Sequence, residues 1–413
     1  MAAQAEPLVY HGEEKLIVSI DIGVTRSAVS YVHAYPGRPL DVRVVTKWPG
    51  QPEAAGLPYI PTLVAYCNDQ LVACGAEASD LVGDEDYEVA RWFKLHLDPQ
   101  VMRISDQSSA SEGDTYPSPR LEIPPLPSQI TLQRVFSDLI RYIFEKFQAF
   151  FELNTPNGSA VWSRLSSSIA IILPHPSVWD TQQQSFLKQA AQLAGIVQSE
   201  DDARLRIEFV TEDEASIHYS LRSLSDQTWL REGAMFAMME AGIATVESTL
   251  YTCKGLTPKL VLEETGGIFV IRAAERHLRE KLRESRYGDD ESIREMLEIF
   301  GKKTKVIFDS TSHFGMVFDG TQERLVIDFA GRRDNDREHG IIQGKFTLNR
   351  LEVCKILDTV IIQIIDSCLK LIQGKKVERL FLLGSFGESP YLRLRLKEEL
   401  GKQGIEVVAV EEF

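Results

Sequence analysis

The sequence has few cysteines and lacks several common catalytic and metal-binding motifs. Its five cysteines include no Cys-x-x-Cys pair and are odd in number, so neither a disulfide framework nor a cysteine-ligated zinc site is indicated. The eight histidines show no His-Glu-x-x-His spacing, and neither a Gly-x-x-x-x-Gly-Lys-Ser/Thr loop nor a Gly-x-Ser-x-Gly elbow occurs. The common helical zinc site, the P-loop and the serine-hydrolase elbow are therefore excluded.

Long apolar runs and clusters of basic residues are missing too. The best candidate for a membrane span, residues 357–371, is interrupted by Asp358 and Asp366, and a span needs roughly 18 apolar residues. The first fifteen residues lack the pattern of a secretory signal. With 45 Lys and Arg against 60 Asp and Glu, the net charge is −15, which disfavours nucleic acid. These features predict a soluble, cytoplasmic protein that binds neither nucleic acid nor membranes.

The composition that remains is that of an ordinary globular protein. The chain has 413 residues, of which 44% are hydrophobic and 25% charged, and this suits two or three domains with sizeable cores. Residues 105–128 are rich in proline and serine, so we expect a loop there. The charged residues 331–340 predict an exposed turn.

The order of predicted strands and helices occurs twice along the chain. Each copy begins with three strands, continues with a variable insert and a long amphipathic helix, and then alternates strands with helices. Such duplication predicts two α/β lobes that face one another. The expected strands of the two meanders are residues 15–20, 28–33 and 41–47, and residues 234–239, 245–252 and 259–263. The segments expected after the first insert are 132–151 (helix), 168–173 (strand), 181–194 (helix), 206–210 (strand) and a helix from 213; those after the second are 348–372 (helix), 377–383 (strand), 391–400 (helix) and 405–410 (strand).

Three glycine-containing turns are the candidate ligand-binding segments. Asp21-Ile22-Gly23 follows the first strand, where backbone amides can approach a phosphate and a carboxylate can hold the water shell of Mg²⁺. Alone, such a turn is more often a plain hairpin. Glu240-Ala241-Gly242 occupies the same place in the second copy, and two opposed amide-lined turns suit a polyphosphate. The third turn, residues 384–390, can pack against a base or ribose, or it is a strand-to-helix connection with Ser389 as N-cap.

This combination resembles the ATPase region of the seventy-kilodalton heat-shock chaperone family, within the actin and sugar-kinase superfamily, and is most similar to its divergent fungal members. The resemblance covers residues 16–410. It implies an α/β, two-lobed actin-like ATPase fold made of duplicated βββαβα lobes, with Mg²⁺ and ATP or ADP in a central cleft. The implied lobes are residues 1–228, with an insert at about 61–128, and residues 229–413, with an insert at about 265–335. No peptide-binding domain is expected after them.

The resemblance assigns roles to individual residues. Lys94 matches the catalytic lysine, which orients the attacking water and offsets developing charge; the alternative is a surface lysine in a charged helix. Glu212 and Asp21 complete the catalytic set, and together with Glu240 they would hold the metal through water. The implied nucleotide-binding residues are Gly23, Val24, Thr25, Gly242, Ile243, Thr245, Gly266, Gly267, Lys305, Gly384 and Ser385.

Several positions depart from the pattern of the family. Val24 replaces a threonine, and Asp213 replaces a proline that the family uses in interdomain signalling. In the second phosphate loop, Ile243 and Ala244 replace glycines, and a β-branched residue does not readily adopt a positive φ. Ile271 replaces an aspartate near the nucleoside, and Ser385 replaces a glycine. These changes predict slow or impaired hydrolysis.

The leading interpretation is an ATP-binding, chaperone-like stress protein with weak ATPase activity and co-chaperone or client proteins as partners. The competing interpretation is a pseudo-ATPase with a degenerate, nucleotide-free site, whose lobes act as a scaffold for protein interactions. A sugar kinase ranks third, because no sugar-binding pattern is present.

Overall fold

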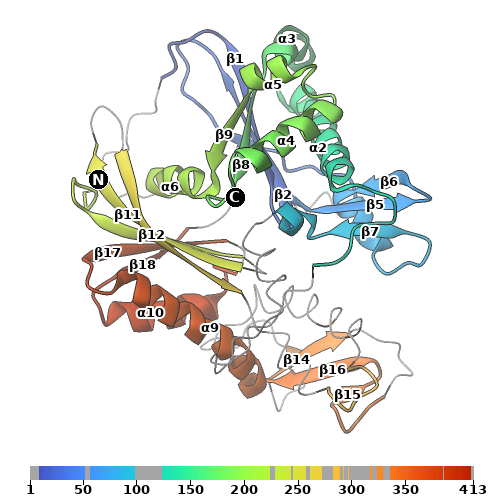
Figure 1. Cartoon of the computed structure of the whole chain (residues 1–413), viewed down its shortest axis with the longest axis vertical. Helices are drawn as coiled ribbons and strands as arrows, with labels where there is room; N and C mark the ends of the chain where they lie inside the picture. Colours follow the sequence, from blue (N-terminus) through green and yellow to red (C-terminus); the bar gives the residue numbers. More distant parts are fainter. Residues whose placement is uncertain are drawn as a thin grey trace. The chain divides into compact units, whose positions relative to one another are not determined.

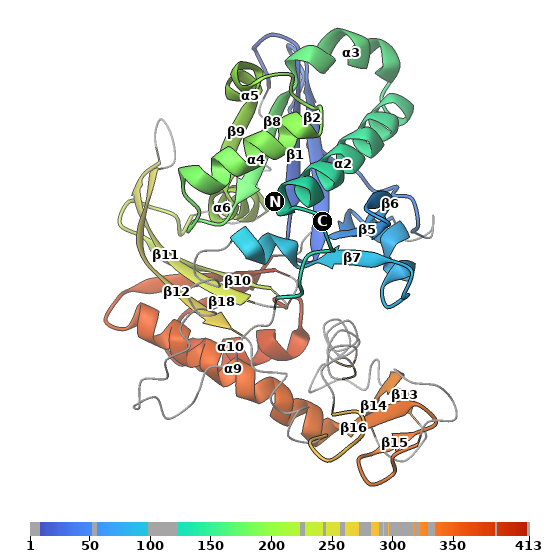
Figure 2. The same ribbon diagram turned by 45° about the vertical axis from the view of Figure 1, so that its right-hand side comes forward.

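The protein is described here by a computed structural model, in which the described residues are 9–51, 56–97, 123–223, 228–242, 245–256, 261–271, 282–288, 292, 296, 317–318, 323–328, 335–384 and 386–410. They form a mixed α/β fold with several sheets. The chain divides into two compact units, one ending at His218 and the other beginning at Tyr219 (Figures 1 and 2). The predicted site residues Ile243, Lys305 and Ser385 lie outside the described residues.

The first part of the chain contains a large sheet with helices, and a smaller sheet in an insert. Its strands, α-helices and short 3-10 helices (η) are β1 (Lys15–Ile22), β2 (Arg26–Ala34), β3 (Arg43–Val44), β4 (Tyr59–Pro61), β5 (Leu63–Cys67), β6 (Gln70–Cys74), η1 (Gly75–Leu81), β7 (Glu88–Arg91), η2 (Phe93–Leu97), α2 (Leu132–Asn154), α3 (Gly158–Leu165), η3 (Ser166–Ser168), β8 (Ala170–His175), α4 (Thr181–Leu193), α5 (Glu200–Arg206), β9 (Ile207–Thr211) and α6 (Glu212–Ser223).

The large sheet of the first unit has the order β3-β2-β1-β8-β9, and β4 pairs with β2 outside this order. β1 and β2 are antiparallel, whereas β1, β8 and β9 run parallel. Residues along β1 alternate between buried and half-buried, as expected for a strand with one face on a core. α2 and α4 lie side by side along that face (Figures 1 and 2). α2 begins where the Thr131 hydroxyl accepts a hydrogen bond from the Arg134 N–H.

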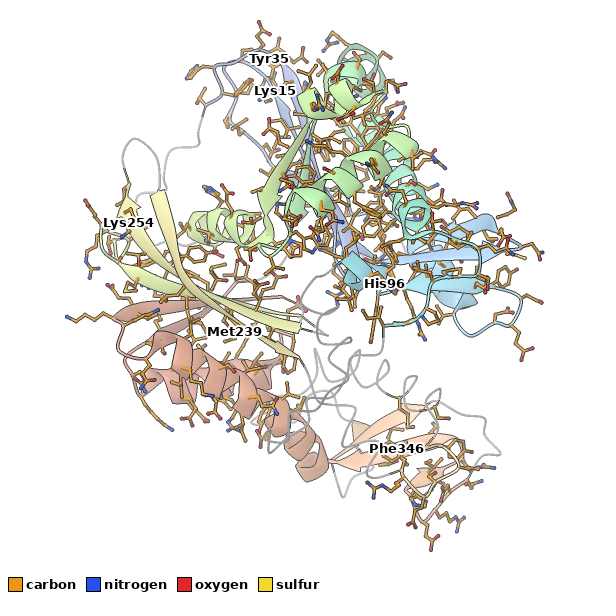
Figure 3. All side chains as sticks on the ribbon, viewed as in Figure 1. Lys15, Tyr35, His96, Met239, Lys254 and Phe346 are labelled. Atoms are coloured by element: carbon orange, nitrogen blue, oxygen red, sulfur yellow. The ribbon has the colours of Figure 1, made fainter. Side chains whose placement is uncertain are left out.

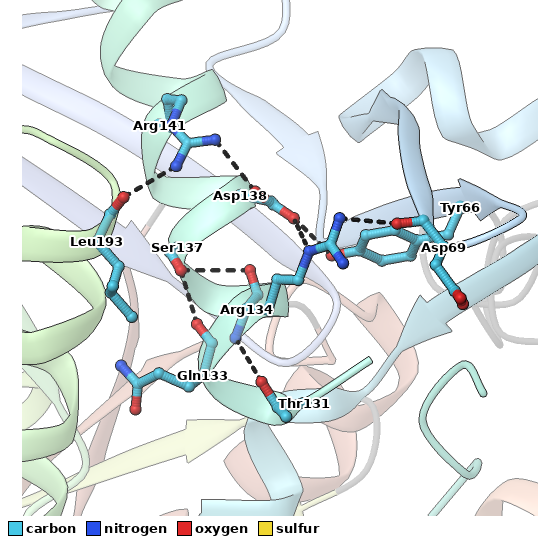
Figure 4. Close-up of polar contacts among 9 residues, drawn as sticks. All are labelled: Tyr66, Asp69, Thr131, Gln133, Arg134, Ser137, Asp138, Arg141 and Leu193. Carbon is cyan, nitrogen blue, oxygen red and sulfur yellow. Dashed lines mark hydrogen bonds and ion pairs between the residues drawn. The ribbon is translucent and has the colours of Figure 1, made fainter. Parts of the chain in front are cut away.

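A buried carboxylate on α2 connects this helix to the insert. Figure 4 shows Asp138 between two arginines of the same helix, Arg134 and Arg141. The Tyr66 hydroxyl of β5 donates to Asp138 at 3.0 Å, and Arg134 donates to the Asp69 carbonyl of the β5–β6 turn at 2.7 Å. The small sheet β6-β5-β7 is thus held against α2 by hydrogen bonds to a single charged cluster.

The second part of the chain repeats this strand order. Its elements are β10 (Met235–Ala241), β11 (Thr245–Gly255), β12 (Val261–Ile271), β13 (Val317–Phe318), β14 (Glu323–Asp328), β15 (Ile341–Ile342), β16 (Lys345–Asn349), α9 (Arg350–Ile372), β17 (Val377–Leu383), α10 (Pro390–Gly401) and β18 (Glu406–Ala409). The main sheet has the order β12-β11-β10-β17-β18, with the first three strands antiparallel and the last three parallel. α9 and α10 lie beside this sheet (Figure 1) and contribute apolar side chains to its core. The duplicated strand order predicted from the sequence is therefore present in both units.

Some predicted elements differ in length, and two helices were not predicted. The third strand, predicted at residues 41–47, is only the two-residue β3. α3 and α5 were missed because each has no more than eight residues, too few to show a helical period. β12 runs to Ile271, well beyond the predicted strand at 259–263. The predicted boundaries of the lobes and inserts stay a prediction.

Candidate functional site

The candidate residues of the first unit gather at one edge of its large sheet. β1, β8 and β9 are parallel neighbours that end at Ile22, His175 and Thr211. The loops after parallel neighbours leave the sheet at the same edge, which is where α/β proteins commonly bind ligands. The predicted residues Asp21 and Glu212 belong to this edge.

The first glycine-containing turn is a tight hairpin between β1 and β2. The Gly23 N–H donates to the Arg26 carbonyl at 2.9 Å, and the Thr62 N–H donates to the Thr25 carbonyl at 3.0 Å. A Cβ atom at Gly23 would lie only 2.4 Å from the Arg26 carbonyl oxygen, so the hairpin itself requires glycine here. Val24 and Thr25 are half-buried. Asp21 lies opposite Ala28, on the face of β1 away from the buried residues.

Lys94 and Glu212, far apart in the sequence, form an ion pair. Lys94 Nζ donates to Glu212 Oε1 at 2.6 Å. Lys94 lies in η2, next to the buried Phe93 that packs edge-on against Phe136 of α2, and is itself only 6% exposed. Glu212 is the first residue of α6, directly after β9. The burial of Lys94 contradicts the alternative of a surface lysine, and Glu212 supplies the partner that a buried charge needs.

Two aromatic residues beside this pair were not predicted from the sequence as part of the site. Lys94 Nζ lies 5.6 Å from the centroid of the Trp179 ring, and Trp179 is 5% exposed. The ring of His175 stacks on that indole with an angle of 11° between the planes. His175 Nδ1 donates to the Pro176 carbonyl at 2.7 Å, so Nε2 accepts from the Gln184 side-chain amide at 3.1 Å. The sequence offered one signal for this contact, the aromatic Trp179 directly before Asp180, which is the N-cap of α4.

The candidate residues of the second unit also lie at neighbouring strand ends. β10 runs parallel to β17, with Glu240 opposite Leu383. Gly384 has a φ of +81°, and a Cβ atom there would lie 2.7 Å from the Ala241 carbonyl oxygen. The Phe386 N–H donates to that oxygen at 2.6 Å. Phe386 is thus hydrogen-bonded to the end of β10, directly before Gly242. Ser389 caps α10, as the alternative of a strand-to-helix connection predicts.

The remaining predicted residues lie in strands. Glu240 is directly opposite Glu247 in the β10–β11 ladder. Thr245 is opposite Ile271, and Gly266 and Gly267 pair with Leu250 and Thr249. Within the described ranges, no group of three or more His, Cys, Asp or Glu side chains could hold a metal ion. No helix in the described parts of the chain is long and apolar enough to cross a membrane.

Comparisons with known proteins relate the chain weakly to heat-shock proteins. It is 27% identical over 200 residues to heat shock 70 kDa protein 12B from Homo sapiens, a match of 46% of this chain and 26% of that protein. It is 22% identical over 201 residues to heat shock 70 kDa protein 12A from Homo sapiens, with the same two shares, and 23% identical over 212 residues to the Mus musculus protein of that name, with shares of 49% and 28%. No protein-family model matches the chain. The matches cover about a quarter of each relative's length and support a distant relationship to the heat shock 70 kDa proteins.

Proposed function

We propose that the chain is a nucleotide-binding protein of the actin-like ATPase type, which binds Mg·ATP and hydrolyses it slowly. The observation that carries this proposal is the part-buried contact of 2.6 Å between Lys94 and Glu212. Both residues were chosen from the sequence for one site, and they meet at the edge of the sheet to which the first turn also belongs.

The chemistry of these residues fits a metal-bound triphosphate. Asp21 and Glu212 supply carboxylates at the ends of two parallel strands, β1 and β9, of one sheet. Mg²⁺ commonly takes one or two carboxylates together with water and phosphate oxygens. Glu240, which the resemblance also assigns to the metal, would act through water. When bound, Mg²⁺ would neutralise phosphate charge. The turns at Gly23 and at Gly242, with Thr25, Thr245 and Gly384, are the proposed contacts to the nucleotide.

The ion pair gives Lys94 a fixed position next to a carboxylate. In the proposed reaction, the ammonium offsets charge that develops on the terminal phosphate and orients the attacking water. Glu212 holds the ammonium in place, and the Trp179 ring next to it limits access of solvent.

The alternative of a nucleotide-free scaffold is favoured by the register of two acidic residues in the second unit. Glu240 and Glu247 face one another in the ladder, and like charges directly opposite are unfavourable in a sheet. They would also repel a phosphate unless a cation lies between the carboxylates and the phosphate. Chaperone and stress functions, co-chaperone or client partners, a cytoplasmic location and similarity to fungal relatives are further proposals, which rest on the resemblance.

Calorimetric titration with ATP, with and without Mg²⁺, tests the proposed function. We expect binding that requires Mg²⁺ and that Asp21→Asn and Lys94→Met both weaken about tenfold or more, since each removes a charge-assisted contact. Lys146→Met is the matched control, because Lys146 on α2 also lies over an aromatic ring, that of Tyr142, at 5.2 Å. Absence of binding to a folded wild-type protein would contradict the proposal and favour the scaffold.

A further inference from the structure

Arg26 is a charged residue at the candidate site that the proposed function has not used. It is the first residue of β2, and its carbonyl closes the hairpin by accepting from the Gly23 N–H. Asp21 lies opposite Ala28 in the ladder. Since residues two apart in a strand share a face, the side chains of Arg26, Ala28 and Asp21 lie on the same side of the hairpin. This is the side away from the buried residues of β1.

The guanidinium of Arg26 is held against an aromatic ring. Its central carbon lies 3.9 Å from the centroid of the Tyr59 ring, a close cation–π contact. Tyr59 belongs to β4 and pairs with Ala28 of β2, so the ring and the guanidinium are fixed to adjoining strands. Stacking of this kind orients the plane of the guanidinium and leaves its N–H groups free to donate at the edges.

One of these N–H groups lacks an acceptor. Arg26 Nη1 is buried and has no hydrogen-bond partner among the described residues. Arg26 also forms no ion pair with any carboxylate in the described part of the chain. A buried charged donor without a partner is unfavourable. The arrangement is therefore one that an oxyanion would complete.

The residues of the first turn indicate which oxyanion Arg26 would bind. Between Gly23 and Arg26 stand only Val24, which is apolar, and Thr25, so Arg26 is the single cation of the turn. A guanidinium matches phosphate oxygens in charge and in bidentate geometry.

We propose that Arg26 is a phosphate-binding residue, whose guanidinium, stacked on Tyr59, donates to the phosphate oxygens of a nucleoside triphosphate. This inference rests on the proposed function, because it assigns Arg26 to the same nucleotide. It goes beyond that function by adding the Arg26 side chain to the phosphate contacts of the first turn.

Titration of the full chain with Mg·ATP and with adenosine tests this inference. We expect Arg26→Ala to weaken binding of Mg·ATP by about tenfold to a hundredfold, the range for a lost hydrogen bond to a charged group. Affinity for adenosine should change by less than about twofold, and Arg26→Lys should recover part of the loss, because lysine keeps the charge without the fork. Arg26→Gln keeps a planar group over Tyr59 without charge, and it replaces Arg26→Ala if the latter does not fold.

Arg38→Ala is the matched control. Arg38 also lies over a tyrosine, at 5.6 Å from the centroid of Tyr35, but it is exposed. Figure 3 labels Tyr35 and Lys15 together at the end of the hairpin away from the Gly23 turn. This variant should leave binding of Mg·ATP unchanged.

Three other outcomes would contradict the inference or the proposed function. If the wild type binds Mg·ATP and Arg26→Ala binds it equally well, the inference is wrong and the proposed function stands. If the affinities for Mg·ATP and adenosine fall together, Arg26 acts by holding Tyr59 and β4 in place, and the inference is wrong. If the folded wild type binds no ATP, the proposed function fails and the inference fails with it.

Discussion

A buried lysine is tolerated only when its charge is matched, and Lys94 illustrates this requirement. Its ammonium is buried, whereas the Glu212 carboxylate retains some contact with solvent. Removal of the lysine leaves a carboxylate that water can still partly reach, so the expected loss is smaller than for a fully buried pair. The pair is thus held in place at a moderate energetic cost.

A double-mutant cycle measures this pair directly. We expect Lys94→Met to lower the free energy of unfolding by roughly 1–3 kcal/mol, and the cycle with Glu212→Gln to give a coupling energy of about 1–3 kcal/mol. The control cycle uses Arg204 and Glu200, whose 2.5 Å contact is exposed on α5, and its coupling should stay below about 0.5 kcal/mol. Urea denaturation gives the four stabilities of each cycle. Equal coupling in both cycles would show that burial of Lys94 adds nothing.

Tyr66 predicts a stability that declines at high pH. Burial, and then the neighbouring charge of Asp138, raises the pKa of Tyr66 well above its usual range. Because the folded state holds this proton more tightly than the unfolded state, its contribution is complete below the ordinary pKa of about 10 and is lost as the pH rises above it. Burial also raises the pKa of the nearby Cys74 thiol to about 12, which acts in the same direction.

The variant Tyr66→Phe separates the contribution of Tyr66 to this pH dependence from that of Cys74. At pH 7 it should lower the free energy of unfolding by roughly 1–2 kcal/mol, because the hydrogen bond to Asp138 is lost. At pH 10.5 the difference from wild type should shrink, since only the wild type loses stability by ionisation of Tyr66 in the unfolded state. Tyr35→Phe, at an exposed tyrosine, should show no difference at either pH. An unchanged difference for Tyr66→Phe between the two pH values would contradict the assignment.

At the scale of elements, apolar patterns and capping residues made most strands of the two large sheets and the long helices predictable. β1, α2, α4, β17 and α10 were predicted to within a few residues, because apolar runs mark the strands and helical periods or cap residues mark the helices. The two-residue β3 and the short α5 carry no such signal. The family resemblance assigned Lys94 and Glu212 to one site, but no pattern in the sequence predicted the contact between their side chains. The contact between Lys94 and Glu212 depends on how η2 of the insert meets the end of β9, which is a property of the tertiary fold.

The same Gly→Ala change in the Gly23 turn and in α10 tests how the two backbone environments affect stability. Gly23→Ala should lower the free energy of unfolding by roughly 1–3 kcal/mol, because its Cβ would lie 2.4 Å from the Arg26 carbonyl oxygen. Gly401→Ala should instead raise it by about 0.5–1 kcal/mol, because Gly401 is helical and a Cβ there meets nothing within 4 Å. Thermal unfolding of both variants measures the effect. A neutral Gly23→Ala variant would mean that the hairpin relaxes freely.

At the scale of the whole molecule, each unit has its own apolar core. One core gathers side chains of β1, α2 and β8, and the other gathers side chains of β10, α9 and β17. Parts of a chain with separate cores commonly unfold as separate cooperative units. The tryptophans report on this division, because Trp229 is the single one after His218 in the sequence, and the other four precede it.

The Trp229→Phe variant therefore reports unfolding of the first unit alone by fluorescence, whereas circular dichroism reports both units. Without ligand, we expect the circular dichroism of the wild type to show a second transition, from unfolding of the second unit. The fluorescence of the Trp229→Phe variant should lack this transition. A ligand raises the midpoint of the parts that it binds, by about 2.7 kcal/mol in stability at a hundredfold excess over Kd. If Asp21, Lys94 and Arg26 act with Gly242 and Gly384 on one nucleotide, saturating Mg·ATP raises both transitions. A rise confined to the fluorescence transition would mean that the altered loop after Glu240 no longer contributes, and the absence of any rise would leave the scaffold as the function of both units.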